Sequence, residues 1–183
     1  GQALTISIIG LHEERKGHLI LLKSLDKLCK KRQELTENLT VYVEGEGYLT
    51  KSLMYYSEQV GISKIIKFMG NAVNISDLYA STDILVVPSL YSEDLPNVIS
   101  EAMLFGIPTI GSKIAGIPSQ IEHGENGFLF EPGDFNRLSA IIEEILENPA
   151  LISMMSSKCV NKFYKKYDKD ISTSRYMNII GGL

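Results

Sequence analysis

The stretch Ile84-Leu85-Val86-Val87-Pro88 decides the fold, because it is apolar without a break and ends at a proline. A strand with one face in water alternates apolar and polar residues, so an unbroken apolar strand is expected to be buried on both faces. Burial on both faces is typical of a parallel sheet covered by helices on either side. The stretch therefore predicts a central strand of an α/β domain.

Short apolar runs alternate with longer helical patterns on both sides of this stretch. Leu21, Leu25 and Leu28, for example, repeat at the spacing of one helix face. The predicted strands cover residues 4–10, 39–43, 65–69, 84–87, 108–111 and 127–130, and the predicted helices cover 21–29, 49–60, 75–80, a segment from about Pro96, 138–146, 151–167 and 170–180. About six strands with helices between them predict a single doubly wound, Rossmann-like domain over residues 1–183, with a helical C-terminal tail. In this fold the ligand binds beyond the carboxyl ends of the strands, where loops and helix N-termini meet.

The composition limits the classes of function. The 183 residues are 44% hydrophobic and 22% charged, which is enough for a self-sufficient core. With 18 basic and 22 acidic side chains and no block of like charge, binding to DNA through its phosphates is not expected. Cys29 and Cys159 lie far apart, which favours thiols in a reducing, cytoplasmic compartment. No apolar run approaches a membrane span, and the missing initiator Met suggests a piece of a longer protein.

Two glycine-containing loops follow the first two predicted strands. Gly10-Leu11-His12-Glu13-Glu14-Arg15-Lys16-Gly17 places two cations and a glycine at a helix entrance, where backbone N–H groups attract anions. It suits a phosphate, although a solvated turn explains the same residues. Val43-Glu44-Gly45-Glu46-Gly47 permits close approach of the backbone to a ligand, but it lacks the third glycine of the dinucleotide motif. Ordinary turn chemistry explains it equally well.

The polar loop after the central strand carries the strongest signal. Glu93 lies in that loop, and Glu101 lies just over a turn into the helix that is expected to begin around Pro96. Carboxylates accept hydrogen bonds from sugar hydroxyls, while N–H groups at the helix start suit a phosphate. The alternative is that both glutamates are ordinary surface charges. His123 has no neighbours at metal-ligand spacing, and the sequence contains no G-x-S-x-G nucleophile motif.

Taken in order, these segments resemble the C-terminal, donor-binding domain of a family 4 retaining glycosyltransferase, one half of the two-domain GT-B architecture. Residues 10–17 are similar to the family's G-R-L-x-x-x-K-G loop, 43–47 to its G-x-G turn, and 68–73 to its F-x-G segment beside the nucleobase. Residues 93–103, Glu-Asp-Leu-Pro-Asn-Val-Ile-Ser-Glu-Ala-Met, resemble E-G-L-P-N-V-x-x-E-A-M. Further matches are residues 105–110, 116–118, 126–130 and 132–134. The resemblance covers nearly the whole chain.

The resemblance implies roles for the matching residues. Glu101 would accept hydrogen bonds from the ribose of a nucleotide sugar, and Glu93 would face the donor sugar and help to place its anomeric carbon. Lys16 would neutralise the diphosphate, on which negative charge builds as the glycosidic bond breaks. The other implied nucleotide-binding positions are Gly10, Arg15, Gly45, Gly47, Met69, Gly70, Val73, Leu95, Asn97 and Val98.

Two residues depart from the family pattern. Leu11 stands where the family has an arginine, so a bidentate phosphate donor is absent there, and Arg15 is a candidate replacement. Asp94 replaces a common glycine and adds a negative charge beside the donor pocket. These departures leave an alternative hypothesis, in which the chain is a degenerate, non-catalytic domain that binds nucleotide or only a partner protein. A sugar phosphorylase of the same architecture is a further alternative.

The resemblance also defines what the rest of the protein would supply. The N-terminal domain of this architecture provides the acceptor site, so the isolated chain is expected to bind nucleotide weakly and to transfer nothing. No metal is expected, and no protein nucleophile is assigned for transfer with retention. The acceptor would be a saccharide or a lipid-linked sugar, as in cell-surface polysaccharide or glycolipid synthesis. The full-length protein would then work in the cytoplasm, with peripheral contact at the inner face of the membrane left open.

Overall fold

The computed structural model describes residues 3–71, 74–92 and 94–167. The described strands are β1 Leu4–Ile9, β2 Leu39–Glu44, β3 Ile66–Gly70, β4 Ile84–Val87, β5 Thr109–Ser112 and β6 Gly127–Phe130. They form one parallel sheet in the order β3-β2-β1-β4-β5-β6. This is the doubly wound arrangement that the sequence predicts.

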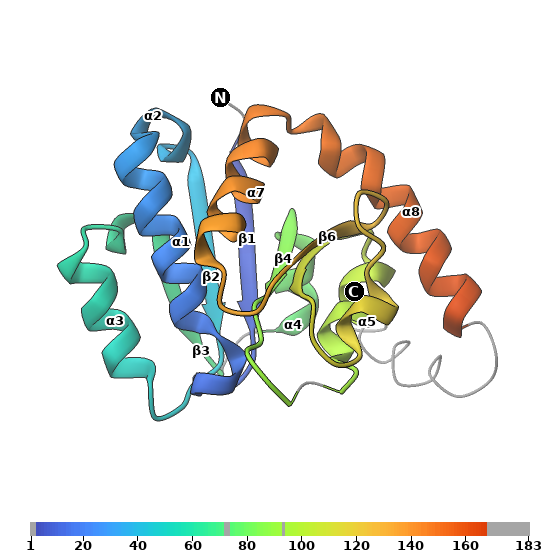
Figure 1. The fold of residues 1–183 in the computed structure, drawn as a ribbon, viewed down its shortest axis with the longest axis horizontal. Coiled ribbons are helices and arrows are strands. Elements are labelled where there is room, and N and C mark those ends of the chain that lie inside the picture. The colour runs from blue at the N-terminus through green and yellow to red at the C-terminus, as the bar shows by residue number, and fades with distance from the viewer. Residues whose placement is uncertain (1–2, 72–73, 93, 168–183) are drawn as a thin grey trace.

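Helices cover both faces of the sheet (Figure 1). The described helices are α1 His18–Lys31, α2 Gln33–Thr36, α3 Thr50–Gln59, α4 Ile75–Ala80, α5 Asn97–Leu104, α6 Ile117–Gln120, α7 Phe135–Glu147 and α8 Ala150–Tyr167, with short 3-10 turns η1 Glu14–Lys16 and η2 Ser63–Ile65. Apolar residues of α1 and α7 pack in one core, and apolar residues of α4, α5 and α6 pack in a second core. Helix α8 contributes to both, because Met155 belongs to the first core and Phe163 to the second.

Strand β4 confirms the reason for predicting a parallel sheet. Ile84 and Val86 point into the core that contains α1 and α7, whereas Leu85 and Val87 belong to the core that contains α5. All four side chains are buried. An apolar residue is therefore required at every position of this strand, and not only at every second one.

The sequence did not predict two of the helices. Helices α2 and α6 contain only four residues each, too few to display a 3.6-residue period. Strands β3 and β5 are displaced by one residue from their predicted bounds, and α5 begins at Asn97 with Pro96 as its N-cap. The predicted helix over residues 170–180 lies outside the described residues.

The order of the strands places the topological switch point between β1 and β4. From β1 the chain proceeds outward through β2 and β3 on one side, and from β4 it proceeds through β5 and β6 on the other. In doubly wound folds the ligand crevice is expected at this point, beyond the carboxyl ends of the two strands. The first and third loops singled out in the sequence follow these two strands.

Candidate functional site

The loops that follow β1 and β4 are in direct contact. The Leu90 amide donates a hydrogen bond to the Arg15 carbonyl at 2.8 Å, and Arg15 Nη1 donates to the Ser92 carbonyl at 2.9 Å. Gly17 has a φ of 71°, and a Cβ there would lie 2.0 Å from the Pro88 carbonyl oxygen. Only glycine fits at this position, so the contact between the two loops depends on it.

The two cations of the first loop have different surroundings. The guanidinium of Arg15 pairs with Glu13, with 2.6 Å between Nη2 and Oε1. Lys16 is half-buried at the end of η1, and its aliphatic chain lies beside Gly10 at the end of β1. Lys16 therefore lies at the carboxyl end of β1, whereas Arg15 joins the loop to the one after β4.

The loop after β2 packs against the first loop through backbone atoms. Gly45 has a φ of 105°, and a Cβ on it would lie 2.2 Å from the Gly10 carbonyl oxygen. A Cβ on Gly47 would lie 2.5 Å from the carbonyl oxygen of His12. The Gly45 amide also donates to the carbonyl of Gly70, the last residue of β3, at 3.1 Å. The ends of β1, β2 and β3 are thus held together, with Met69 half-buried in β3.

Two buried histidines lie beneath the first loop. The ring centroids of His12 and His18 are 4.7 Å apart, and both side chains are buried. His12 Nδ1 is 2.8 Å from Thr50 Oγ1, but neither ring nitrogen of His18 has a hydrogen-bond partner in the part of the chain that the structure describes. Burial lowers the pKa of His18 to about 3, and the nearby His12 and Lys16 act in the same direction. Sequence reasoning missed this pair, although His12 occupies the leucine position of the loop motif and so offered a signal.

Acidification is expected to destabilise the fold through His18. The unfolded chain takes up this proton near pH 6.5, whereas the folded chain does so only near pH 3, so the unfolded state binds more protons between these values. The free energy of unfolding should therefore fall by up to ~1.4 kcal/mol per pH unit as the pH drops below about 6.5. Urea unfolding of His18→Leu at pH 7.5 and 5 should show a smaller loss than the parent chain. The exposed His123→Gln serves as the control, and an equal loss in His18→Leu would refute the assignment.

Helix α5 begins after the loop that follows β4. Pro96, its N-cap, is buried, whereas Leu95 and Asn97 are exposed and Val98 is half-buried. Within the described residues no side chain caps the first turn; the Ile99 amide donates to the Pro96 carbonyl, which leaves the amides of Asn97 and Val98 to an anion. The backbone of Gly116 packs against the loop before α5, because a Cβ on Gly116 would lie 1.7 Å from the Asp94 carbonyl oxygen.

Glu101 lies one turn further along α5 and is half-buried. Its Oε2 accepts a hydrogen bond from the hydroxyl of Tyr79 at 2.8 Å. The structure therefore brings Gly10, Lys16, Gly45 and Gly47 together, and Glu101 lies on the helix that follows the loop after β4. The predicted sites Val73 and Glu93 lie outside the described residues. The roles of all the predicted site residues stay predictions.

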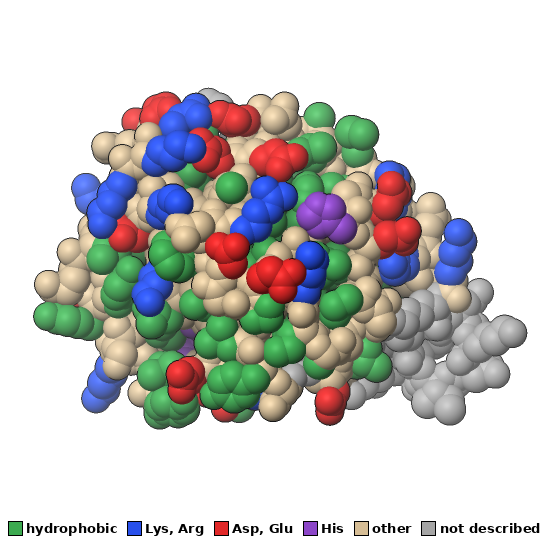
Figure 2. Space-filling model, in the orientation of Figure 1, with side chains coloured by type: hydrophobic (Ala, Val, Ile, Leu, Met, Phe, Trp, Pro, Cys, Tyr) green, Lys and Arg blue, Asp and Glu red, His purple; other side chains and the backbone are tan. Residues whose placement is uncertain are grey.

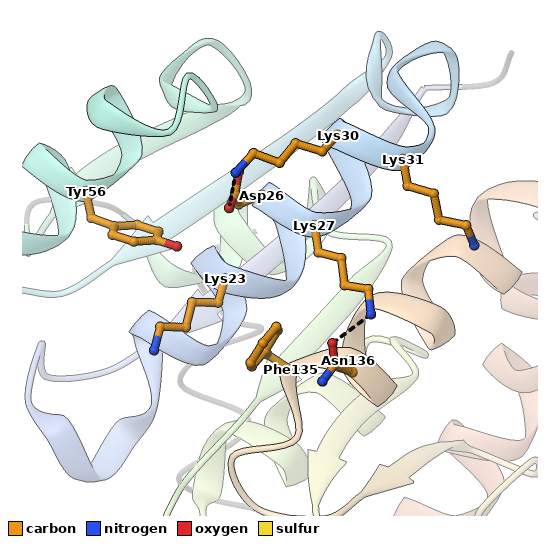
Figure 3. Close-up of a pocket in the computed structure, with 8 residues that line it drawn as sticks. All are labelled: Lys23, Asp26, Lys27, Lys30, Lys31, Tyr56, Phe135 and Asn136. Atoms are coloured by element: carbon orange, nitrogen blue, oxygen red, sulfur yellow. Dashed lines mark hydrogen bonds and ion pairs between the residues drawn. The ribbon is translucent and has the colours of Figure 1, made fainter.

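A separate hollow of about 580 Å³ lies between α1, α3 and α7 (Figure 3). Four lysines of α1 line it: Lys23, Lys27, Lys30 and Lys31. The other lining residues are Asp26, Tyr56, Phe135 and Asn136. Lys30 pairs with Asp26, Lys27 donates to Asn136, and Lys31 pairs with Glu143 of α7. Basic and acidic side chains are accordingly interspersed on the face shown in Figure 2. Lys27 and Lys31 thus join α1 to α7, and the hollow is not part of the crevice.

The model of the family described as "Glycosyl transferases group 1" matches residues 2–165. The chain belongs to this family. It is 31% identical over 146 residues to an uncharacterized glycosyltransferase of Haemophilus influenzae, and the aligned stretch covers 78% of the chain and 41% of that protein. It is 27% identical over 135 residues to N-acetyl-alpha-D-glucosaminyl L-malate synthase of Bacillus anthracis, and that alignment covers 74% of the chain and 35% of the enzyme. The chain thus spans less than half the length of these curated relatives.

Solved structures show that the group 1 domain has the fold of a GT-B half. HepE of Anabaena, in complex with UDP, superimposes with a TM-score of 0.82 at 24% identity over 99% of the chain and 49% of HepE. The C-terminal domain of the group 1 protein LpcC from Francisella tularensis superimposes with a TM-score of 0.77 at 23% identity, over 92% of the chain and 87% of that domain. The predicted fold class is confirmed, and so is the resemblance to a glycosyltransferase of group 1. Among the described residues, no helix is long and apolar enough to cross a membrane.

Proposed function

We propose that the chain is the donor-binding half of a retaining glycosyltransferase that moves a sugar from a nucleoside diphosphate to a saccharide or lipid-linked acceptor. One observation carries the proposal: the lysine loop after β1 and the loop after β4, which leads into the Glu101 helix, contact each other at the switch between these two strands. Solved relatives of the same fold support it, because HepE contains UDP in one structure and UDP-glucose in another.

The diphosphate would lie between the first loop and α5. The ammonium group of Lys16 would neutralise it, and the backbone amides of Leu95, Asn97 and Val98 would donate hydrogen bonds to its oxygens. Gly10 has no side chain and lies beside Lys16, so a phosphate held by the lysine would be able to approach the backbone there. This arrangement stabilises the charge that develops on the leaving group, which lowers the barrier to breaking the glycosidic bond.

The nucleoside and the sugar would occupy opposite ends of the site. Glu101 would accept hydrogen bonds from the ribose hydroxyls, while the backbone around Met69, Gly70 and Val73 would border the base. Glu93 would face the donor sugar and place its anomeric carbon. We assign no protein nucleophile and expect no metal requirement. We also propose that the isolated chain transfers no sugar, because the acceptor site belongs to a second domain.

Leu11 favours a second candidate, a domain that binds nucleotide but does not catalyse transfer. The leucine side chain is 58% exposed and donates no hydrogen bond where the family has an arginine. Arg15 can take the place of that arginine only if its guanidinium breaks its hydrogen bonds to Glu13 or to the Ser92 carbonyl. A full-length protein that binds a sugar nucleotide but never transfers or hydrolyses it would support this second candidate.

Substituting Glu101 tests the proposed ribose contact. Calorimetric titration of the chain with UDP, GDP and ADP, up to millimolar concentrations, should show weak binding that prefers one nucleotide. Glu101→Ala should weaken that binding by about 1–3 kcal/mol, or about 5- to 150-fold, because the ribose hydroxyls lose a charged acceptor. Glu58→Ala, which removes an exposed carboxylate from α3, is the matched control. Binding of none of the three nucleotides would contradict the proposed function.

A further inference from the structure

Tyr79 of α4 contacts α5 and the C-cap residue that follows it. Its hydroxyl donates to Glu101 Oε2 at 2.8 Å, and its ring stacks on Phe105, the C-cap, with centroids 5.2 Å apart and planes inclined by 26°. Glu101 and Phe105 are four residues apart, about one helical turn. The two contacts therefore fix Tyr79 to the stretch of α5 that carries the carboxylate.

Tyr79 is itself held in place. Its side chain is 1% exposed and belongs to the core that contains α5. A buried ring has few alternative rotamers, so its hydroxyl is directed at one point. The glutamate side chain, in contrast, is half-buried and has three rotatable bonds, which lose entropy when a ligand orders them. A fixed donor on one carboxylate oxygen removes part of that cost before the ligand arrives.

We propose that Tyr79 is a positioning residue, whose hydroxyl orients the Glu101 carboxylate so that its remaining acceptor sites meet the ribose hydroxyls. The inference rests on the proposed function of Glu101. The hydrogen bond occupies Oε2 from the side of α4, and within the described residues Oε1 is left to a ligand. Tyr79 does not touch the nucleotide in this arrangement and acts only through Glu101.

Tyr79→Phe isolates the hydroxyl, because the ring and its stacking on Phe105 are kept. Titrations use UDP, GDP and ADP, each compared with its 2′,3′-dideoxy analogue, which lacks both ribose hydroxyls. Affinity for the preferred ribonucleotide should fall about 3- to 10-fold, the effect of one lost hydrogen bond, while affinity for the dideoxy analogue should not change. Tyr56→Phe, a half-buried tyrosine on α3, should change neither affinity.

A double-mutant cycle separates positioning from a structural role. In the Glu101→Ala background, Tyr79→Phe should have no further effect on affinity, because the group through which it acts is gone. Equal losses for the ribonucleotide and the dideoxy analogue would show a structural role and overturn the inference.

The same titrations separate this inference from the proposed function. If Glu101→Ala weakens binding but Tyr79→Phe leaves the ratio of the two affinities unchanged, the inference is overturned and the proposed function stands. If no nucleotide binds, or if Glu101→Ala has no effect, the proposed ribose contact fails and the inference fails with it.

Discussion

Lys16→Ala is expected to lower kcat for sugar transfer by about 10²- to 10³-fold in the full-length enzyme to which this chain would belong. Negative charge builds on the diphosphate as the glycosidic bond breaks, so an ammonium group beside it stabilises the transition state more than the bound donor. KM for the donor should therefore rise much less than kcat falls. Steady-state kinetics with the preferred sugar nucleotide measure both constants.

Two variants control for the loss of charge. Lys23→Ala removes an ammonium group from the α1 hollow, outside the crevice, and should leave kcat within about twofold. Lys16→Arg retains the positive charge in a different shape and should recover part of the activity. A Lys16→Ala enzyme with wild-type kcat would remove Lys16 from the mechanism and favour a nucleotide-binding domain without catalysis.

Gly45→Ala is expected to lower the free energy of unfolding by about 3 kcal/mol or more. A positive φ alone costs a non-glycine residue about 1–3 kcal/mol. At Gly45 the new Cβ would also stand 2.2 Å from the Gly10 carbonyl oxygen, which is backbone and has little room to move. The loops after β1 and β2 must then separate, and the proposed phosphate site separates with them. Urea unfolding at neutral pH measures the effect.

Gly61→Ala provides the matched control for the backbone cost. Gly61 also has a positive φ, 78°, but a Cβ there meets no atom within 4 Å. This variant should therefore lose only about 1 kcal/mol, the backbone contribution by itself. Equal losses in the two variants would mean that the two loops can move apart freely, in conflict with a preformed site.

The sequence predicts the sheet well because each strand carries its own signal. The unbroken apolar run of β4 requires burial on both faces, and that property is local. The loop motifs likewise place Lys16 after β1 and the start of the Glu101 helix after β4, two neighbouring strands of the parallel sheet. Short helices such as α2 have no periodicity to detect, so they appear only in the structure.

The contacts that orient the candidate site were not predictable, because they join residues distant in sequence. Tyr79 reaches Glu101 across 22 residues, and nothing in the pattern of α4 shows that its hydroxyl points toward α5. The packing of His12 on His18 joins residues close in sequence, but it depends on the conformation of the loop after β1, which no periodic pattern specifies. The sequence identifies the loops, and tertiary packing determines how their side chains are oriented.

A crystal structure of the chain with its preferred nucleoside diphosphate tests the central claim most directly. We expect ribose oxygens about 2.6–3.2 Å from the carboxylate of Glu101 and a diphosphate between Lys16 and the start of α5. A nucleotide bound elsewhere, for example among the lysines of the α1 hollow, with Glu101 left contacting only Tyr79, would contradict it.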